Sequence, residues 1–235
     1  GEFVGTILLV LLGDGVCANV TLNNSGFKAA GALFIAIGWG LAVCLPAAAF
    51  SGICPASYNP ALTIALFADG TLAAADGYTI AVIIEMIIAE LAGGFIGAVL
   101  VWVAFKPQFD ASSDLGDSLR GVFCTAPGVR NIPYNILQEA IATFWLVFAI
   151  KAACGAFDLG TFGVFLVIVS CGTTFGGLTG YAMNAARDTA PRLAFAILPI
   201  KGKGDADWAY GLTAPLIGPV IGALVAVALY AALPL

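Results

Sequence analysis

The feature that most constrains this chain is a series of long apolar stretches separated by short polar ones. The hydrocarbon core of a bilayer, about 30 Å thick, is crossed by a helix of roughly 20 apolar residues. Composition agrees with such a fold, because 61% of the residues are hydrophobic, only 10% are charged and the mean hydropathy is +1.02. We therefore expect an all-α integral membrane protein. Its six transmembrane helices are predicted at 2–20, 31–50, 79–105, 133–153, 161–177 and 209–232.

Two further apolar stretches, 59–68 and 184–195, are too short to cross a membrane. Each follows an irregular segment that contains glycine or proline, taken here as 52–58 and 176–183. Backbone of that kind is tolerated at membrane depth only where it is buried in protein or lines a cavity. We therefore expect two re-entrant half-helices, with the irregular segments turning free carbonyl groups toward a lumen.

Composition also excludes several classes of function. The net charge of −5 and the absence of basic runs argue against nucleic acid, whose phosphates demand clustered Lys and Arg. The chain contains no histidine, which rules out His-dependent catalysis, and its six cysteines form no close metal-type pair. We expect buried free thiols, no catalytic site, no metal and no cofactor. The first apolar run lacks a basic flank and a small-residue cleavage site, so it is predicted to be a span and not a signal peptide.

The chain contains two copies of one unit. Each copy has three spans and one half-helix in the same order, and a glycine follows the half-helix asparagine by 38 residues in both. The matched pairs are Asn59 with Asn184, Gly97 with Gly222, Glu2 with Glu139, and Thr6 with Thr143. Because three spans is an odd number, the second copy enters the membrane from the opposite face, as in inverted-repeat transport proteins. We expect one channel domain, 1–235, made of repeat one at 1–105, a connecting loop at 106–132 and repeat two at 133–235.

The chemistry of the two asparagines follows from residue type. Asparagine is a favoured helix N-cap, so Asn59 and Asn184 can each begin a half-helix and still present amide N–H donors to a pore. Two half-helix N-termini that face each other place partial positive charge at the channel centre. A cation or hydrated proton meets a barrier there, whereas a neutral molecule with a hydroxyl oxygen finds donors.

These motifs resemble the aquaporin superfamily, and specifically its glycerol-facilitator (aquaglyceroporin) branch, over essentially all 235 residues. The residues that carry the resemblance are Asn59-Pro60-Ala61, the degenerate Asn184-Ala185-Ala186, the Arg187-Asp188 pair, and the glutamates Glu2 and Glu139 that open each half. The resemblance implies a multi-pass channel of the plasma membrane that assembles as a homotetramer, with a pore in each subunit. It implies no chemical step. The lost second proline is expected to cost some rigidity, since proline at the first helical position is favourable but optional.

By the same resemblance, the narrowest part of the pore is formed by Trp39, Gly172, Tyr181 and Arg187. Arginine offers five fixed donors and stays charged, so Arg187 is expected to bind a hydroxyl pair and repel cations. Trp39 and Tyr181 offer apolar faces for a carbon chain, and Gly172 leaves room. Position alone equally allows Trp39 to be an interfacial aromatic residue. Tyr181 departs from the Phe common in glycerol facilitators.

Other acidic residues and one loop are interpreted separately. Glu2 and Glu139 are expected to accept backbone N–H bonds from the irregular segments. Asp14 is expected to face water or a neighbouring subunit, and Glu85 and Glu90 have no assigned partner. In Cys54-Pro-Ala-Ser57, proline and serine stand where the family usually has glycine and histidine, so this loop is expected to be supported differently.

The function predicted is passive diffusion of glycerol, with water alongside. One alternative is a facilitator for another small neutral solute such as propanediol, urea or protonated lactic acid. A second is a coupled secondary transporter, which the absence of a titrating partner for Arg187 argues against, and a third is a structural protein without conduction. The family's topology would put six cations outside, against the positive-inside tendency: Lys28, Lys106, Arg120, Arg130, Lys201 and Lys203.

Overall fold

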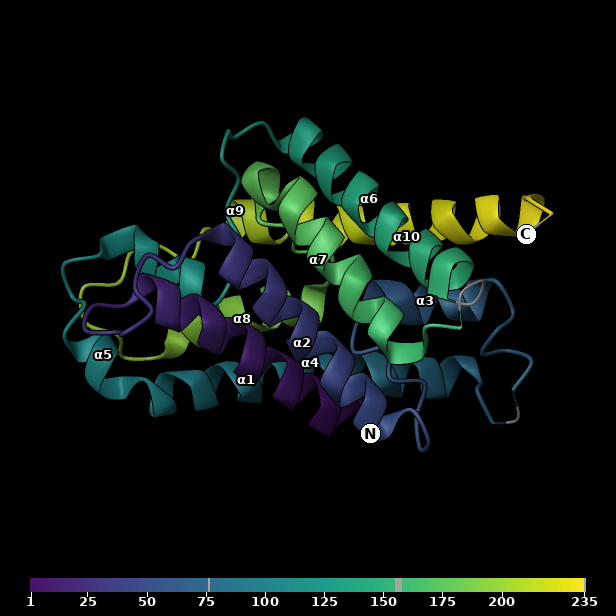
Figure 1. Cartoon of the computed structure of the whole chain (residues 1–235), viewed down its shortest axis with the longest axis horizontal. Coiled ribbons are helices and arrows are strands. Elements are labelled where there is room, and N and C mark those ends of the chain that lie inside the picture. Colours follow the sequence, from purple (N-terminus) through teal and green to yellow (C-terminus); the bar gives the residue numbers. More distant parts are fainter. Residues whose placement is uncertain (76, 155–157, 235) are drawn as a thin grey trace.

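The computed structural model describes residues 1–75, 77–154 and 158–234, and every regular element in these ranges is helical. Positions 76, 155–157 and 235 of the predicted repeats lie outside the described residues. Six helices are long and apolar enough to cross a membrane, and they lie at different inclinations to the long axis of the molecule (Figure 1). The six are α1 (Glu2–Thr21), α2 (Ala32–Phe50), α4 (Ile80–Ala104), α6 (Ile132–Ala149) continued by η2 (Ile150–Cys154), α7 (Gly160–Thr179), and α9 (Trp208–Gly211) with α10 (Ala214–Ala232). The six predicted spans are confirmed to within a few residues.

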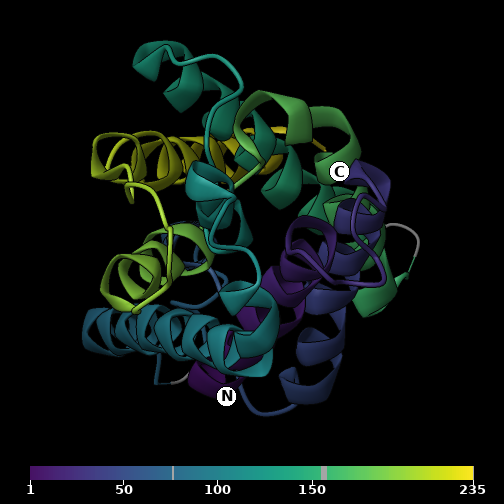
Figure 2. The ribbon, with the colours of Figure 1, turned by 90° about the vertical axis from the view of Figure 1, so that its left-hand side faces the viewer.

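Two shorter helices correspond to the predicted half-helices. They are α3 (Pro60–Ala68) and α8 (Ala185–Ile197), and an asparagine caps the N-terminus of each. Helix α3 packs on α4 and α10, and α8 does the same. Figure 2 shows α8 between α4 and α10 in the view from the end that carries the connecting segment. The predicted half-helices are therefore present, and both are held by the last spans of the two halves.

The two halves use the same helix packing. Helix α1 packs on α4 in the first half, and α6 packs on α10 in the second. A side chain added at Gly93 would place its Cβ 2.5 Å from the carbonyl oxygen of Phe3, and one at Gly218 would place it 2.6 Å from that of Ile136. Both glycines lie 34 residues after their capping asparagine. Small residues at these points let the helix backbones approach closely, as is common in membrane bundles.

One predicted boundary is wrong. The segment 176–183 was expected to be irregular, but α7 continues through Thr179. It ends where Gly180 adopts φ +80°, the left-handed conformation that commonly terminates a helix. Only 180–183 is irregular, so the second loop is shorter than the first.

The connecting segment is more structured than a polar loop. It contains α5 (Lys106–Asp110) and η1 (Gly116–Val122). Four apolar side chains of these helices and of the residue after η1 are almost fully buried: Phe109, Leu119, Val122 and Phe123. Phe123 stacks on Phe109 and also packs against Phe195 of α8, with ring centroids 5.5 and 5.7 Å apart. The polar residues of 106–132 therefore cover a small apolar core that bears on the second half-helix.

Polar contacts join the segments 22–31, 105–131 and 198–207 at one end of the molecule. Asn23 donates to Asp114, Arg120 donates to the carbonyl of Asp205, and Arg130 pairs with Asp207. The six cations that the family's topology would put outside all lie on the three joined segments.

A separate ion pair links η2 to the end of α3, where Lys151 pairs with Asp69 at 2.7 Å.

The contact between α4 and α8 generates a prediction. A Cβ at Gly94 would overlap the carbonyl oxygen of Ala186, whereas a Cβ at exposed Gly177 would meet no atom within 4 Å. We expect Gly94→Ala to destabilise the protein by about 1–3 kcal/mol, because backbone must move to accept the methyl group. Gly177→Ala is the matched control and should be neutral. Thermal unfolding in detergent measures both, and equal midpoints would contradict the prediction.

Candidate functional site

The two half-helices meet end to end through their capping asparagines. Asn59 accepts a hydrogen bond from the amide of Ala61, and its Nδ2 donates to the carbonyl of Met183 at 2.9 Å. Asn184 accepts from the amide of Ala186, and its Nδ2 donates to the carbonyl of Tyr58 at 2.7 Å. Each side chain thus caps its own helix and binds the loop of the other. Because a side-chain amide has two N–H donors, one on each asparagine is left beyond these bonds.

Two buried glutamates hold the loops that precede the half-helices. The carboxylate of Glu2 accepts from the amides of Ser57 and Tyr58 at 3.1 and 2.8 Å. That of Glu139 accepts from the amides of Ala182 and Met183 at 3.0 and 2.8 Å. A carboxylate only accepts hydrogen bonds, so two adjacent backbone donors match it well.

The loops themselves adopt a demanding backbone conformation. In each loop, two residues other than glycine have positive φ and are separated by one residue. They are Ala56 at 54° and Tyr58 at 50° in the first loop, and Tyr181 at 43° and Met183 at 52° in the second. Such residues cost free energy and persist where the surroundings over-determine them. The glutamate bonds and the cross-loop asparagine bonds supply that constraint in both halves.

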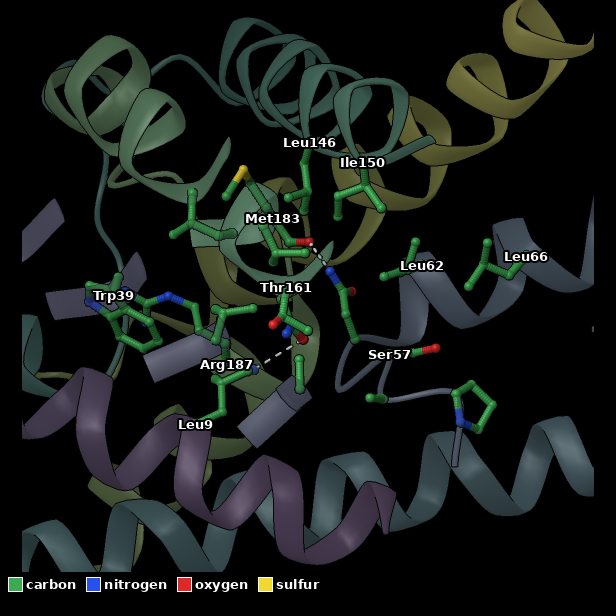
Figure 3. A pocket seen from close by; sticks show the side chains of 18 of the residues that line it. Leu9, Trp39, Ser57, Leu62, Leu66, Leu146, Ile150, Thr161, Met183 and Arg187 are labelled. Carbon is green, nitrogen blue, oxygen red and sulfur yellow. Dashed lines mark hydrogen bonds between the residues drawn. The ribbon is translucent and has the colours of Figure 1, made fainter. Parts of the chain in front are cut away.

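A cavity of about 230 Å³ lies beside the asparagines. Figure 3 shows Trp39 and Arg187 toward one end of it and Leu62, Leu66 and Ile150 toward the other. Of the predicted site residues, Trp39, Asn59, Tyr181, Asn184 and Arg187 line the cavity. The remaining predicted residues are buried and do not line it: Glu2, Pro60, Ala61, Glu139, Gly172, Ala185 and Ala186. The cavity therefore joins the central asparagines to the predicted filter along a mostly apolar wall.

The four predicted filter residues lie together. The guanidinium of Arg187 stacks over the ring of Trp39 at 4.0 Å, and the Trp39 Nε1 donates to the sulfur of Cys17 at 3.4 Å. Trp39 is 3% exposed and faces the cavity, so the alternative of an interfacial aromatic residue is wrong. A Cβ at Gly172 would lie 2.7 Å from Ala36 Cβ and 3.1 Å from Tyr181 Cζ, so the glycine leaves room both for α2 and for the tyrosine ring.

Two acidic residues differ from their predicted surroundings. Asp14 was expected to face water or a neighbouring subunit, but it is fully buried, with its Oδ1 3.9 Å from Arg187 Nη1. Arg187 therefore has an acidic neighbour, contrary to the expectation that no titrating group lies beside it. Glu90 accepts a hydrogen bond from the hydroxyl of Thr63 at 2.6 Å, so α4 binds the first half-helix through it. Both acids lie on helices of the first repeat, where sequence spacing does not reveal a partner on another element.

A network that the sequence did not reveal holds the second half-helix. Asp188 accepts from both the amide and the hydroxyl of Thr125 at 2.7 Å, and from Arg192 at 2.8 and 3.1 Å. Arg192 also donates to the carbonyls of Thr125 and Ala206. Asp188 and Arg192 are completely buried. Their i, i+4 spacing on one helix was the available signal, and the carbonyl partners come from loops distant in sequence.

Comparison with known proteins agrees with this architecture. The family described as "Major intrinsic protein" matches residues 1–230. The chain belongs to the major intrinsic protein family. It is 42% identical to "Glycerol uptake facilitator protein 3" of Lactiplantibacillus plantarum, covering 100% of this chain and 95% of the relative. It is 37% identical to a "D/L-lactic acid transporter" of the same organism, covering 96% and 92%. The solved aquaglyceroporin of Plasmodium falciparum superposes with a TM-score of 0.81 at 27% identity, covering 98% and 93%.

The altered loop of this major intrinsic protein has its own support. Pro55 and Ser57 line the cavity, and the Ser57 hydroxyl is buried without a hydrogen-bond partner among the described residues. The neighbouring Tyr58 is fully buried and donates from its hydroxyl to the carbonyl of Pro46 at 2.9 Å. Its ring packs on Gly5, where a Cβ would overlap it. The loop is thus tied to α1 and α2 through a tyrosine and a glutamate.

The paired carboxylates generate a second prediction. In Glu139→Gln, one acceptor oxygen becomes an amide that faces a backbone N–H, so we expect local destabilisation of about 1–3 kcal/mol at the second loop. Hydrogen exchange at the amides of Ala182 and Met183 should accelerate accordingly. The exposed Glu85 on α4 offers the control Glu85→Gln, which should leave these amides unchanged. Equal exchange in both variants would show that Glu139 does not hold the loop.

Proposed function

We propose that this protein is a passive transmembrane channel for glycerol and similar small neutral solutes, with water alongside. The observation that carries the proposal is the cavity that runs from Trp39 and Arg187 to the central asparagines. A polyol presents carbon atoms on one edge and hydroxyl groups on the other. The cavity offers both kinds of surface, since most of its lining is apolar while the guanidinium of Arg187 and the side-chain amides of Asn59 and Asn184 supply donors.

Exclusion of ions and protons is part of the same proposal. The N-termini of α3 and α8 meet at the asparagines and place partial positive charge there. Arg187 adds a permanent cation in the filter. A cation would have to pass both without water to solvate it, whereas a neutral solute exchanges hydrogen bonds with the donors.

The proposal extends to organisation and assembly. The single channel domain 1–235 is divided into repeat one at 1–105, a connecting segment at 106–132 and repeat two at 133–235. Glu2 and Glu139 make equivalent contacts with the loops of their own repeats, and Gly93 and Gly218 pack equivalently on the first helix of each repeat. Both correspondences support this division. Large apolar side chains exposed on the outside of the spans fit contact with lipid and with other subunits of a homotetramer. Since the relatives are bacterial, we place the channel in the plasma membrane.

A second candidate function is a facilitator tuned to another small neutral solute, such as propanediol, urea or protonated lactic acid. The likeness to the D/L-lactic acid transporter favours it. So does Tyr181, whose hydroxyl is buried in the filter without a hydrogen-bond partner among the described residues. That hydroxyl adds a polar group where a carboxylic acid could bind. A coupled transporter is less well supported, because members of this family are passive channels.

Flux through reconstituted protein decides between these candidates. We expect liposomes that contain the protein to take up glycerol faster than empty liposomes in stopped-flow light scattering. Gradients of water, urea, propanediol and lactic acid, the last at a pH below the pKa of the acid, give the order of preference. Glycerol uptake equal to that of empty liposomes, with rapid uptake of another solute, would favour the second candidate.

Arg187→Ala tests the filter. Because the substitution removes a permanent cation from a site with little water, we expect leakage of small cations to rise by about tenfold or more. Arg130→Ala is the matched control, since Arg130 is a surface residue paired with Asp207 and lies outside the cavity. Potassium conductance in planar bilayers measures both variants. If Arg187→Ala excluded potassium as well as the unmodified channel does, Arg187 would not form the filter.

A further inference from the structure

Asp14 is an acidic residue in the middle of an apolar helix, and the proposed pore does not use it directly. It is fully buried, does not line the cavity, and both its carboxylate oxygens lack a hydrogen-bond partner among the described residues. Burying a charge without partners is costly, so such a residue inside a membrane is a functional candidate by default. The question is which group it serves.

One face of α1 forms a layer behind the filter. Gly13 leaves space for the ring of Trp39, which a Cβ there would overlap. Cys17, one turn further along, accepts the Trp39 Nε1 hydrogen bond. Asp14 lies between them and places Oδ1 3.9 Å from Arg187 Nη1. Three residues on one face of α1 thus contact the Trp39–Arg187 stack, and only Asp14 carries a carboxyl group.

The other acidic residue close to Arg187 is already engaged. Asp188 accepts four hydrogen bonds from Thr125 and Arg192, which satisfy both of its oxygens. The guanidinium of Arg187, by contrast, makes no hydrogen bond to another described residue and lines the cavity. Asp14 is therefore the acidic residue placed to balance the charge of Arg187 from behind, while the donors of Arg187 stay free for a solute.

We propose that Asp14 is a charge-compensating specificity residue, which sets the discrimination of this filter between neutral and anionic solutes. The proposal rests on the proposed channel function and deepens it. A lone guanidinium in a narrow, poorly hydrated site would attract anions as strongly as it repels cations. With Asp14 behind it, the filter keeps the fork of donors that binds hydroxyl groups, and its positive potential is weakened enough that it no longer attracts anions. Asp14 acts through Arg187 and does not touch the solute.

The test uses full-length channel in planar bilayers with potassium nitrate, together with glycerol flux in liposomes. Nitrate is a small planar anion that stays ionised at all working pH values. We expect Asp14→Asn to raise nitrate conductance by about tenfold, because the arginine charge is then uncompensated. Glycerol flux should persist, since the donors of Arg187 remain. Nitrate conductance that is unchanged in a glycerol-conducting Asp14→Asn channel would overturn the proposal.

The same substitution in the Arg187→Ala background provides a sharper test. There Asp14 is the uncompensated charge, so Asp14→Asn should lower potassium conductance instead of raising nitrate conductance. This dependence on the background is the signature of a coupled pair. A change of the same sign and size in both backgrounds would also overturn the proposal. If the single variant fails to fold, the potassium conductance of the double variant is compared with that of Arg187→Ala, and equal conductances would overturn the proposal.

Two controls separate charge from packing. Asp14→Glu keeps the charge and should leave nitrate excluded. Glu90→Gln makes the same acid-to-amide change at another fully buried carboxylate, which is held by Thr63 and not by Arg187. It should leave nitrate conductance low, whereas a rise equal to that of Asp14→Asn would refute a specific role for Asp14. These ion effects could also appear in a protein that conducts no glycerol, in its unmodified form or in any variant. In that case glycerol would not be the solute, but the role of Asp14 beside Arg187 would be supported.

Discussion

The structure depends on one constraint, which is that every backbone group in a membrane must find a hydrogen-bond partner. Breaking two helices at the centre of the bundle exposes loop donors and acceptors, and four side chains bind them. Asn59 and Asn184 each bind the carbonyl of the opposite loop, while Glu2 and Glu139 take two amides each. The loops can then keep strained left-handed residues in place and the half-helices can point at each other.

The buried charges fall into two kinds with different consequences. Asp188 and Arg192 satisfy each other and several loop groups, so they lock α8 to the loops at 125 and 206 and leave no charge free. Arg187 is stacked on Trp39 and approached by Asp14 at 3.9 Å, but its donors are not consumed. A satisfied network stabilises a helix, whereas an incompletely satisfied one retains the capacity to bind a solute. Arg187 and Asp188 lie three and four residues after Asn184, so the second half-helix bears both the arginine of the proposed filter and the network that supports the helix.

Much of this arrangement could be predicted from residue patterns, and the misses share one cause. Apolar length predicted the six spans, and the matched Asn and Glu positions indicated both half-helices and their supports. Asp14 was expected to face water or a neighbouring subunit because it lies near the end of the first predicted span, and its partner Arg187 belongs to the other repeat. Thr125 was missed because its partner lies 63 residues away, and 176–179 was called irregular because its glycines obscure a helix that ends only at Gly180.

The sequence by itself determined that the chain crosses a membrane, how often, and where two helices are interrupted. These properties follow from the length of apolar runs and from capping residues, which act locally. Only the tertiary structure decided which groups share the interior. It set Asp14 behind Arg187, the connecting segment beneath α8, and the cavity between Trp39 and the asparagines. Contacts of this kind join elements far apart in the chain, and their distances depend on how closely the glycine-containing helices pack.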